Sequence, residues 1–183
     1  MQVHFDENKF TEMVLYVAER LRNDRTGGAT KLNKVLYFAD FAHTRKYGRP
    51  ISGATYQRLE HGPAPRRLKP VRSRLLAEGA AKVVVEDFLG HDVHRLVPLR
   101  APDLSVFTDH ELATVDGVLD DLRDLTGRQV SDLSHDEPGW KFAGDGESIP
   151  YEMAFAAYQQ VSTPVSRKLA ADVALRYGVV PGR

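Results

Sequence analysis

The 183-residue sequence contains no cysteine and no long uninterrupted apolar run. Without cysteine the chain forms no disulfides, thiolate nucleophiles or cysteine-ligated zinc sites, which fits an expected cytoplasmic location. No stretch approaches the roughly 20 apolar residues of a membrane-spanning helix. The N-terminal residues carry charge where a signal peptide has its apolar segment, so we expect no membrane partner.

The sequence also lacks an excess of charge of either sign, because 25 Lys and Arg residues balance 25 Asp and Glu residues. A globally basic nucleic-acid binder is therefore not favoured, although a local basic patch stays open. The length is sufficient for one domain with its own core. A terminal extension of that domain also stays open.

The spacing of apolar residues predicts a mainly helical α+β fold, in which a small antiparallel sheet or hairpin accompanies a buried central helix. Residues 31–47 are apolar around almost the whole helix circumference, which is typical of a buried position. Residues 82–89 and 93–99 are β-rich and flank Gly90, so they predict a hairpin. The other expected elements are helices over 7–22, 66–79, 109–125, 126–135 and 164–177, a helix ending near Gln160, a short strand within 53–60 and a loop over 137–149.

The candidate catalytic and metal-binding residues do not complete a site. Asp40 and His43 lie on one face of the central helix, but two ligands are too few for zinc, so we expect them to hydrogen-bond to each other. Ser134-His135-Asp136 places triad residue types side by side, whereas real triads assemble from distant positions. We expect Ser134 and Glu137 to form a helix cap, and His91-Asp92-Val93-His94 to be solvated turn residues. The sequence therefore predicts no enzyme, no metal and no cofactor.

A basic run precedes the expected hairpin. A helix–helix–hairpin order is also the outline of a winged helix, whose basic helix enters the DNA major groove. Three interpretations stay open for this run: a solvated helix face, a DNA-binding surface and a surface for an acidic protein partner. Its members are Arg66, Arg67, Lys69, Arg72 and Arg74.

Two further features indicate a binding surface. His61-Gly62-Pro63 predicts a tight corner, because Gly62 permits unusual backbone conformations and Pro63 fixes the direction of the chain. The side chains of Tyr56 and His61 are then expected at the edge of the fold. Trp140, the only tryptophan, lies in the expected loop, where it serves either as a plug over the core or as an interface anchor.

Residues 31–65 resemble the signature region of the SocA-like antitoxin family, also called the Panacea domain. Trp140 and residues 149–152 are similar to the closing region of the family, so the resemblance spans about residues 7–155. It implies an antitoxin domain over 7–155, with a C-terminal helical extension over 156–183 packed on the same domain. His61 departs from the family pattern, because tyrosine is commoner at this position in the family. The residues that carry the resemblance are Lys31, Leu32, Lys34, Tyr37, Phe38, Tyr47, Gly48, Ser52, Gly53, Tyr56, Gly62 and Pro63.

The resemblance implies a bacterial or phage antitoxin that neutralises a toxin encoded nearby, either by direct binding or as an adaptor to a cytosolic protease. The family offers no catalytic residues to transfer. The alternative is a winged-helix-like transcriptional regulator that binds DNA with helix 66–79 and hairpin 81–99, and a homodimer also stays open. The residues expected to bind the partner are Tyr56, His61, Arg66, Arg67 and Trp140.

Overall fold

Helix α2, Ala29–Tyr47, is the centre of the fold in a computed structural model that describes residues 2–88 and 90–156. Its buried side chains include Leu36, Tyr37 and Phe41. The expected central helix is therefore confirmed. The elements that contact α2 are α1 (Glu7–Arg20), α4 (Asp109–Asp121), α5 (Gly127–His135), α7 (Met153–Ala156), β2 (Ala64–Pro65) and β4 (His91–Pro98).

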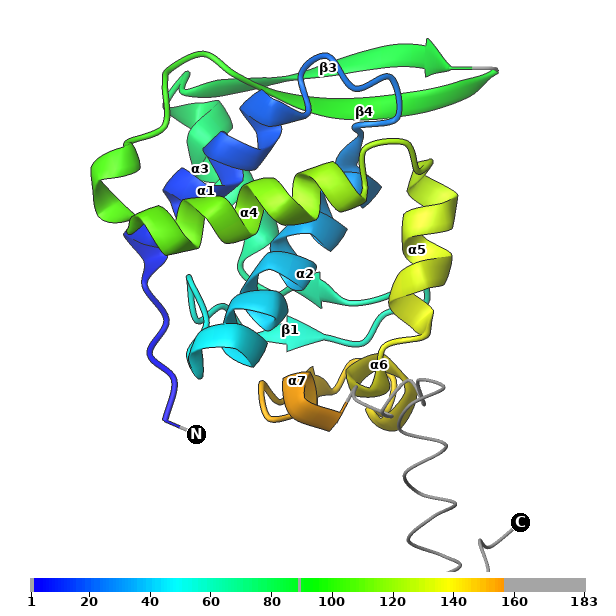
Figure 1. Cartoon of the computed structure of the whole chain (residues 1–183). Coiled ribbons are helices and arrows are strands. Elements are labelled where there is room, and N and C mark those ends of the chain that lie inside the picture. Colours follow the sequence, from blue (N-terminus) through cyan, green and yellow to red (C-terminus); the bar gives the residue numbers. More distant parts are fainter. Residues whose placement is uncertain (1, 89, 157–183) are drawn as a thin grey trace, which may run out of the picture.

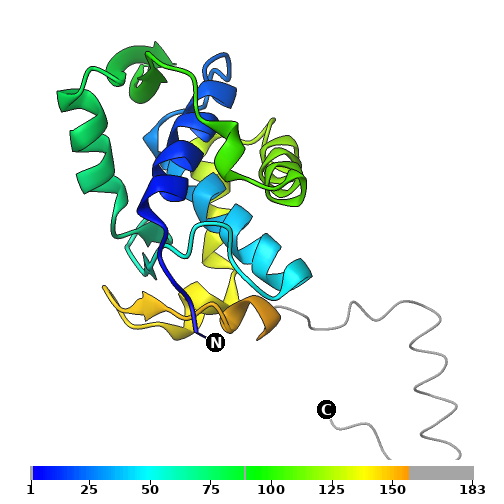
Figure 2. The same cartoon turned by 90° about the vertical axis from the view of Figure 1, so that its left-hand side faces the viewer.

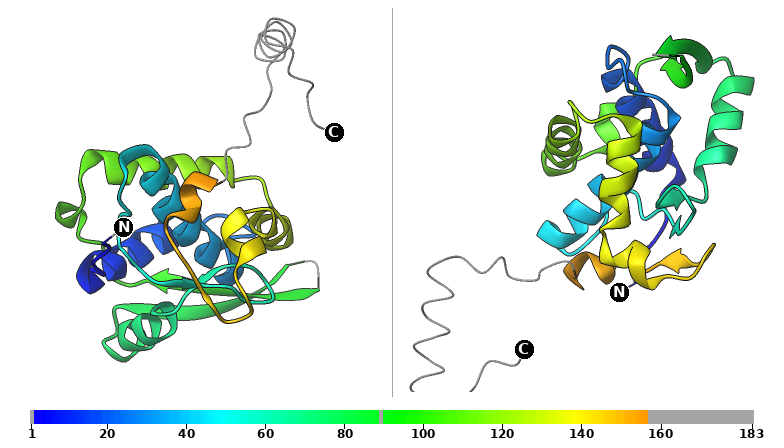
Figure 3. Two further views of the ribbon diagram at one scale, coloured as in Figure 1. Left: turned by 90° about the horizontal axis from the view of Figure 1, so that it is seen from below. Right: turned by 90° about the vertical axis from the view of Figure 1, so that its right-hand side faces the viewer.

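The remaining helices surround α1 and α2. Helix α3, Leu68–Ala77, covers one side of α1 and α4 covers the other (Figure 2). Helix α5 packs against α2, and in the right-hand view of Figure 3 α4 is seen on one side of it and α3 on the other. The hairpin of β3, Ala81–Phe88, and β4 closes one end of the molecule, and α6, Pro138–Phe142, lies with α7 at the opposite end (Figure 1). A short 3₁₀ helix, Leu104–Val106, precedes α4.

Two separate antiparallel sheets accompany the helices, so the mainly helical α+β class is confirmed. Strand β1, Tyr56–Gln57, lies between β2 and β5, Ser148–Ile149, with Tyr56 opposite both Pro65 and Ile149. Strand β3, Ala81–Phe88, pairs with β4 as the predicted hairpin.

Pro65 belongs to β2, an edge strand in which a proline costs no ladder hydrogen bond. Two expectations about the strands and loops were wrong. His91 and Asp92 lie in β4 rather than in the turn. The expected loop over 137–149 contains helix α6, Pro138–Phe142, and strand β5.

The helix ends follow the capping residues. Asp6 accepts a hydrogen bond from the backbone N–H of Lys9, and both Thr108 and Thr126 form capping boxes. Gly48 ends α2 in the left-handed conformation, with φ of 74°. The expected Ser134 cap was wrong, because Ser134 is buried and donates to the Ser131 carbonyl at 2.6 Å.

The described residues include no helix that is both long enough and apolar enough to cross a membrane. The expected C-terminal helix over 164–177 lies outside the described residues, as does all of the 156–183 extension except Ala156.

Candidate partner-binding surface

A buried carboxyl group holds the chain between α2 and β1. Asp40 Oδ1 accepts hydrogen bonds at 2.8 Å from the backbone N–H groups of Ile51 and Ser52. Asp40 Oδ2 accepts from Ser52 Oγ at 2.5 Å and from the Tyr56 hydroxyl at 2.8 Å. The Tyr151 hydroxyl lies 3.2 Å from the same oxygen. Asp40 thus fixes the segment that leads into β1, and through Tyr151 it also reaches the chain after β5.

Burial raises the pKa of Asp40, and the hydrogen bonds from Ser52 and Tyr56 offset this effect only in part. Burial, together with the Asp40 charge, also raises the pKa of Tyr56. The Tyr56 hydroxyl lies 2.8 Å from the Leu36 carbonyl as well as from Asp40, yet it carries one proton. Its single proton therefore serves one of these two acceptors at a time.

This network corrects two expectations. Tyr56 is fully buried rather than presented at the edge of the fold. His43 does not bond to Asp40, because its Nδ1 donates to the Arg49 carbonyl at 2.7 Å. The described part of the chain contains no group of three or more metal-ligating side chains.

The predicted tight corner exists, and we call residues 58–63 the corner. Gly62 has φ of 94°, a conformation that favours glycine. Ser131 of α5 donates to the His61 carbonyl at 2.7 Å, which ties the corner to that helix. The His61 side chain is exposed, as expected, and Leu59 beside it is 42% exposed.

Trp140 is half-buried against the corner. Its Nε1 donates to the Leu59 carbonyl at 2.9 Å, and its ring stacks on His135 with the centroids 4.1 Å apart. The Arg58 guanidinium carbon lies 4.3 Å from the centre of the same ring, within cation–π range. The indole therefore covers the corner and is held in one orientation, while part of it stays accessible to a partner.

Arg66 and Arg67, the two arginines expected to bind the partner, lie at different places on the surface. Arg66 donates to the Gly146 carbonyl at 2.5 Å, and the Gly146 N–H donates to the Arg58 carbonyl of the corner at 2.9 Å, so Arg66 lies beside the corner. Arg67 bonds to Glu7 at 2.9 Å, and Arg74 bonds to the other oxygen of Glu7 at 2.7 Å. The hydrogen bond from Arg67 is the main reason that the pKa of Glu7 is lowered. Two of the five basic side chains, Arg67 and Arg74, therefore bond to the same Glu7 carboxylate.

Sequence reasoning missed three residues of this region. Arg58 packs on Trp140, as described above, and Leu59 exposes an apolar side chain at the corner. Phe142, in the same short helix as Trp140, is 79% exposed, more than any other large hydrophobic side chain that the structure describes. Only its position two residues after Trp140 gave a sequence signal.

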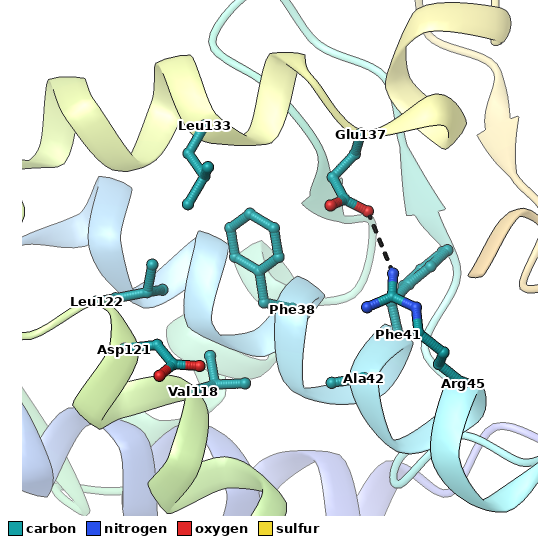
Figure 4. Close-up of a pocket in the computed structure, with 9 residues that line it drawn as sticks. All are labelled: Phe38, Phe41, Ala42, Arg45, Val118, Asp121, Leu122, Leu133 and Glu137. Carbon is teal, nitrogen blue, oxygen red and sulfur yellow. Dashed lines mark ion pairs between the residues drawn. The ribbon is translucent and has the colours of Figure 1, made fainter. Parts of the chain in front are cut away.

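An apolar groove lies on the other side of α5 (Figure 4). It encloses about 170 Å³, and Phe38, Leu122 and Leu133 form much of its wall. At one end Arg45 and Glu137 form an ion pair of 3.7 Å, and burial raises the pKa of Glu137. Leu133 of α5 faces this groove, whereas Ser131 and Ser134 of the same helix face the corner, so the two features are distinct.

Comparison with known proteins gives one match. A family model described as antitoxin SocA-like, Panacea domain, matches residues 32–141, which is more than half of the chain. The matched stretch runs from α2 to α6 and includes Asp40, the corner and Trp140. No curated protein and no solved structure matches the chain.

Proposed function

The chain belongs to the SocA-like Panacea antitoxin family, and on that premise we propose that it is a non-enzymatic domain that binds and neutralises a toxin encoded near its own gene. The family match is the observation that carries this proposal. Neutralisation follows from the complex itself or from delivery of the bound toxin to a cytosolic protease. Both routes require a stable, specific protein–protein interface.

We place the interface on a corner surface made of Leu59, His61, Arg66, Trp140 and Phe142. Strong interfaces depend on a few aromatic and arginine anchors near their centre, and this surface offers each type. The hydrogen bond from Trp140 to the corner already fixes the ring, so little conformational freedom is lost on binding. An interface of about 1,600 Å² extends beyond these five residues, which would form its centre.

The test is paired expression. The neighbouring gene is expressed alone and with this chain, in cells that have or lack each cytosolic protease. Arrest by the neighbour and recovery with this chain in every strain support direct neutralisation. Recovery that requires one protease supports the adaptor route. A toxic neighbour that the chain neither relieves nor co-purifies with contradicts the proposal.

The alternative of a DNA-binding regulator is favoured by one observation, since basic helix α3 is followed directly by the β3–β4 hairpin. The ion pairs of Arg67 and Arg74 with Glu7 argue against this alternative, because they occupy two of the basic side chains that would contact DNA phosphates. If all five basic side chains met phosphates, log affinity would fall with log salt at a slope of about −4.5. Absence of binding to the chain's own promoter at low salt contradicts this alternative.

A further inference from the structure

Two lysines of α2 are buried in different ways. Lys31 and Lys34 are only 1% and 2% exposed. The Lys31 ammonium group bonds to Asp24 Oδ2 at 2.6 Å and to two backbone carbonyls at 2.9 Å, so its three protons all have acceptors. The Lys34 ammonium group has one acceptor among the described residues, the Pro63 carbonyl at 3.1 Å.

The Lys34 side chain lines a pocket between the start of α2 and the corner. The pocket encloses about 380 Å³, enough for a small polar group together with water. Gly62 leaves room for the ammonium group, since a Cβ atom there would lie 2.8 Å from Lys34 Nζ. The residues that line the pocket are Thr30, Asn33, Lys34, Leu59, Glu60, His61, Gly62 and Ala64.

The charge of Lys34 is not balanced within the described chain. It forms no ion pair there, and burial alone lowers its pKa to about 8, with no carboxylate acting against that effect. Glu60 and His61 are the other titratable groups that line the pocket, and both are exposed to solvent. Because water screens the Glu60 charge, the buried cation dominates the inner wall of the pocket.

We propose that this pocket binds a carboxylate group of the toxin, with Lys34 as its cation; this inference rests on the proposed function. A carboxylate accepts the two ammonium protons that have no acceptor among the described residues, and the Thr30 and Asn33 side chains offer further donors at the pocket wall. A protein partner supplies this anion as an Asp or Glu side chain or as its C-terminus. The pocket adjoins the corner surface, since both include Leu59 and His61.

The main test compares two single substitutions on one helix. Lys34→Met removes the pocket cation, and Lys46→Met removes an exposed cation near the end of α2, so the change in net charge is the same. We expect Lys34→Met to weaken binding of the purified toxin roughly 30-fold or more, as for loss of one member of a buried charge pair. Lys46→Met should change the affinity less than about twofold. Equal affinity of wild type and Lys34→Met overturns the inference while the proposed function stands.

Two more variants extend this test. Glu60→Gln should tighten toxin binding a few-fold, because it removes the one negative charge at the pocket. Lys34→Gln keeps a polar side chain without the charge and should lose as much affinity as Lys34→Met. If Lys34→Gln binds the toxin as wild type does, the charge is not recognised and the inference fails.

A second experiment distinguishes a carboxylate group of the toxin from a small free carboxylate. It remains informative if the wild-type chain binds no toxin. Sodium acetate is titrated into the ¹⁵N-labelled chain while the Gly62 amide is followed by NMR. Saturable shifts in wild type that are absent in Lys34→Met, together with Lys34-dependent toxin binding, support the inference. Acetate binding without Lys34-dependent toxin binding assigns the pocket to small carboxylates and overturns the toxin part. Absence of both effects rejects the site.

Discussion

The Lys34 ammonium group lies directly against Gly62, because a Cβ atom at Gly62 would stand only 2.8 Å from Lys34 Nζ. Both residues belong to the segment that resembles the antitoxin family. Their contact gives a physical reason why a glycine stands at position 62 opposite Lys34. Gly62 supplies two properties at once: a left-handed backbone, with φ of 94°, and space for a buried cation.

Gly62→Ala should therefore destabilise the fold more than a glycine substitution that introduces backbone strain alone. Gly48 is the matched control, because its φ is 74° and nothing lies within 4 Å of a Cβ built there. We expect Gly48→Ala to cost about 1 kcal/mol of unfolding free energy and Gly62→Ala about 3 kcal/mol. Urea unfolding measures both, and equal losses would show that the close approach of Ser134 Oγ and Lys34 Nζ to a Cβ at position 62 does not matter.

Substitution of methionine for each buried lysine should change the unfolding free energy in opposite directions. Lys31→Met leaves Asp24 and two carbonyls without their donor, so we expect a loss of about 3 kcal/mol of unfolding free energy. Lys34→Met removes a buried cation with one acceptor, so we expect a gain of about 2 kcal/mol at pH 7. Urea unfolding of both variants at one pH tests this, and a loss for Lys34→Met contradicts the account.

The effect of Lys34 on stability should depend on pH in a defined window. Its pKa falls from the ordinary 10.5 to about 8 in the folded chain. Between pH 8 and 10.5 the unfolded chain binds more protons at this residue, so the unfolding free energy of wild type rises with pH. The advantage of Lys34→Met should thus be complete below pH 8 and shrink towards pH 10.5. Urea unfolding at pH 7, 9 and 10 measures this, and a constant difference rules out the lowered pKa.

Tyr56 should affect stability without affecting recognition. Tyr56→Phe removes a buried hydroxyl from the Asp40 network and should cost about 1–2 kcal/mol of unfolding free energy. Tyr47→Phe is the control, since the Tyr47 ring is exposed and its hydroxyl makes no hydrogen bond with the described residues. Toxin affinity of the folded Tyr56→Phe variant should match wild type. A large loss of affinity would return Tyr56 to the interface.

Trp140 and Phe142 should dominate toxin binding. We expect Trp140→Ala to weaken binding by about 2 kcal/mol or more, which corresponds to roughly 30-fold, and Phe142→Ser by about 1–2 kcal/mol. Val85→Ser is the control, because Val85 is an exposed apolar residue of the hairpin at the opposite end of the molecule. Similar losses for Val85→Ser and Phe142→Ser would indicate that the interface lies elsewhere.

Local sequence patterns were sufficient for most helices. Helices α1, α2, α4 and α5 carry their own apolar periodicity and capping residues, such as Asp6 and Thr108, so their limits follow from neighbouring residues. The three-stranded sheet was predicted only in part. Strand β1 lies within the short strand expected over 53–60, but β2 and β5 are only two residues long, and Tyr56 pairs with Ile149 from a distant part of the chain.

The candidate site was less predictable, because it depends on contacts between distant segments. The sequence pointed to the corner and to Trp140, but not to the hydrogen bond between Trp140 and Leu59. Lys31 and Lys34 look alike, as two cations in an apolar helix. Only the tertiary positions of Asp24, Arg123 and Leu125 decide that Lys31 is satisfied and Lys34 is not.

The most direct test of the central claim is a calorimetric titration of the purified neighbouring toxin into this chain. The account predicts a stoichiometric complex with a Kd of about 1 μM or tighter, in the range of interfaces near 1,600 Å². A variant that combines His61→Ala, Trp140→Ala and Phe142→Ser should release no binding heat while remaining folded. Absence of binding by the wild-type chain to a toxin that arrests growth would contradict neutralisation by direct binding.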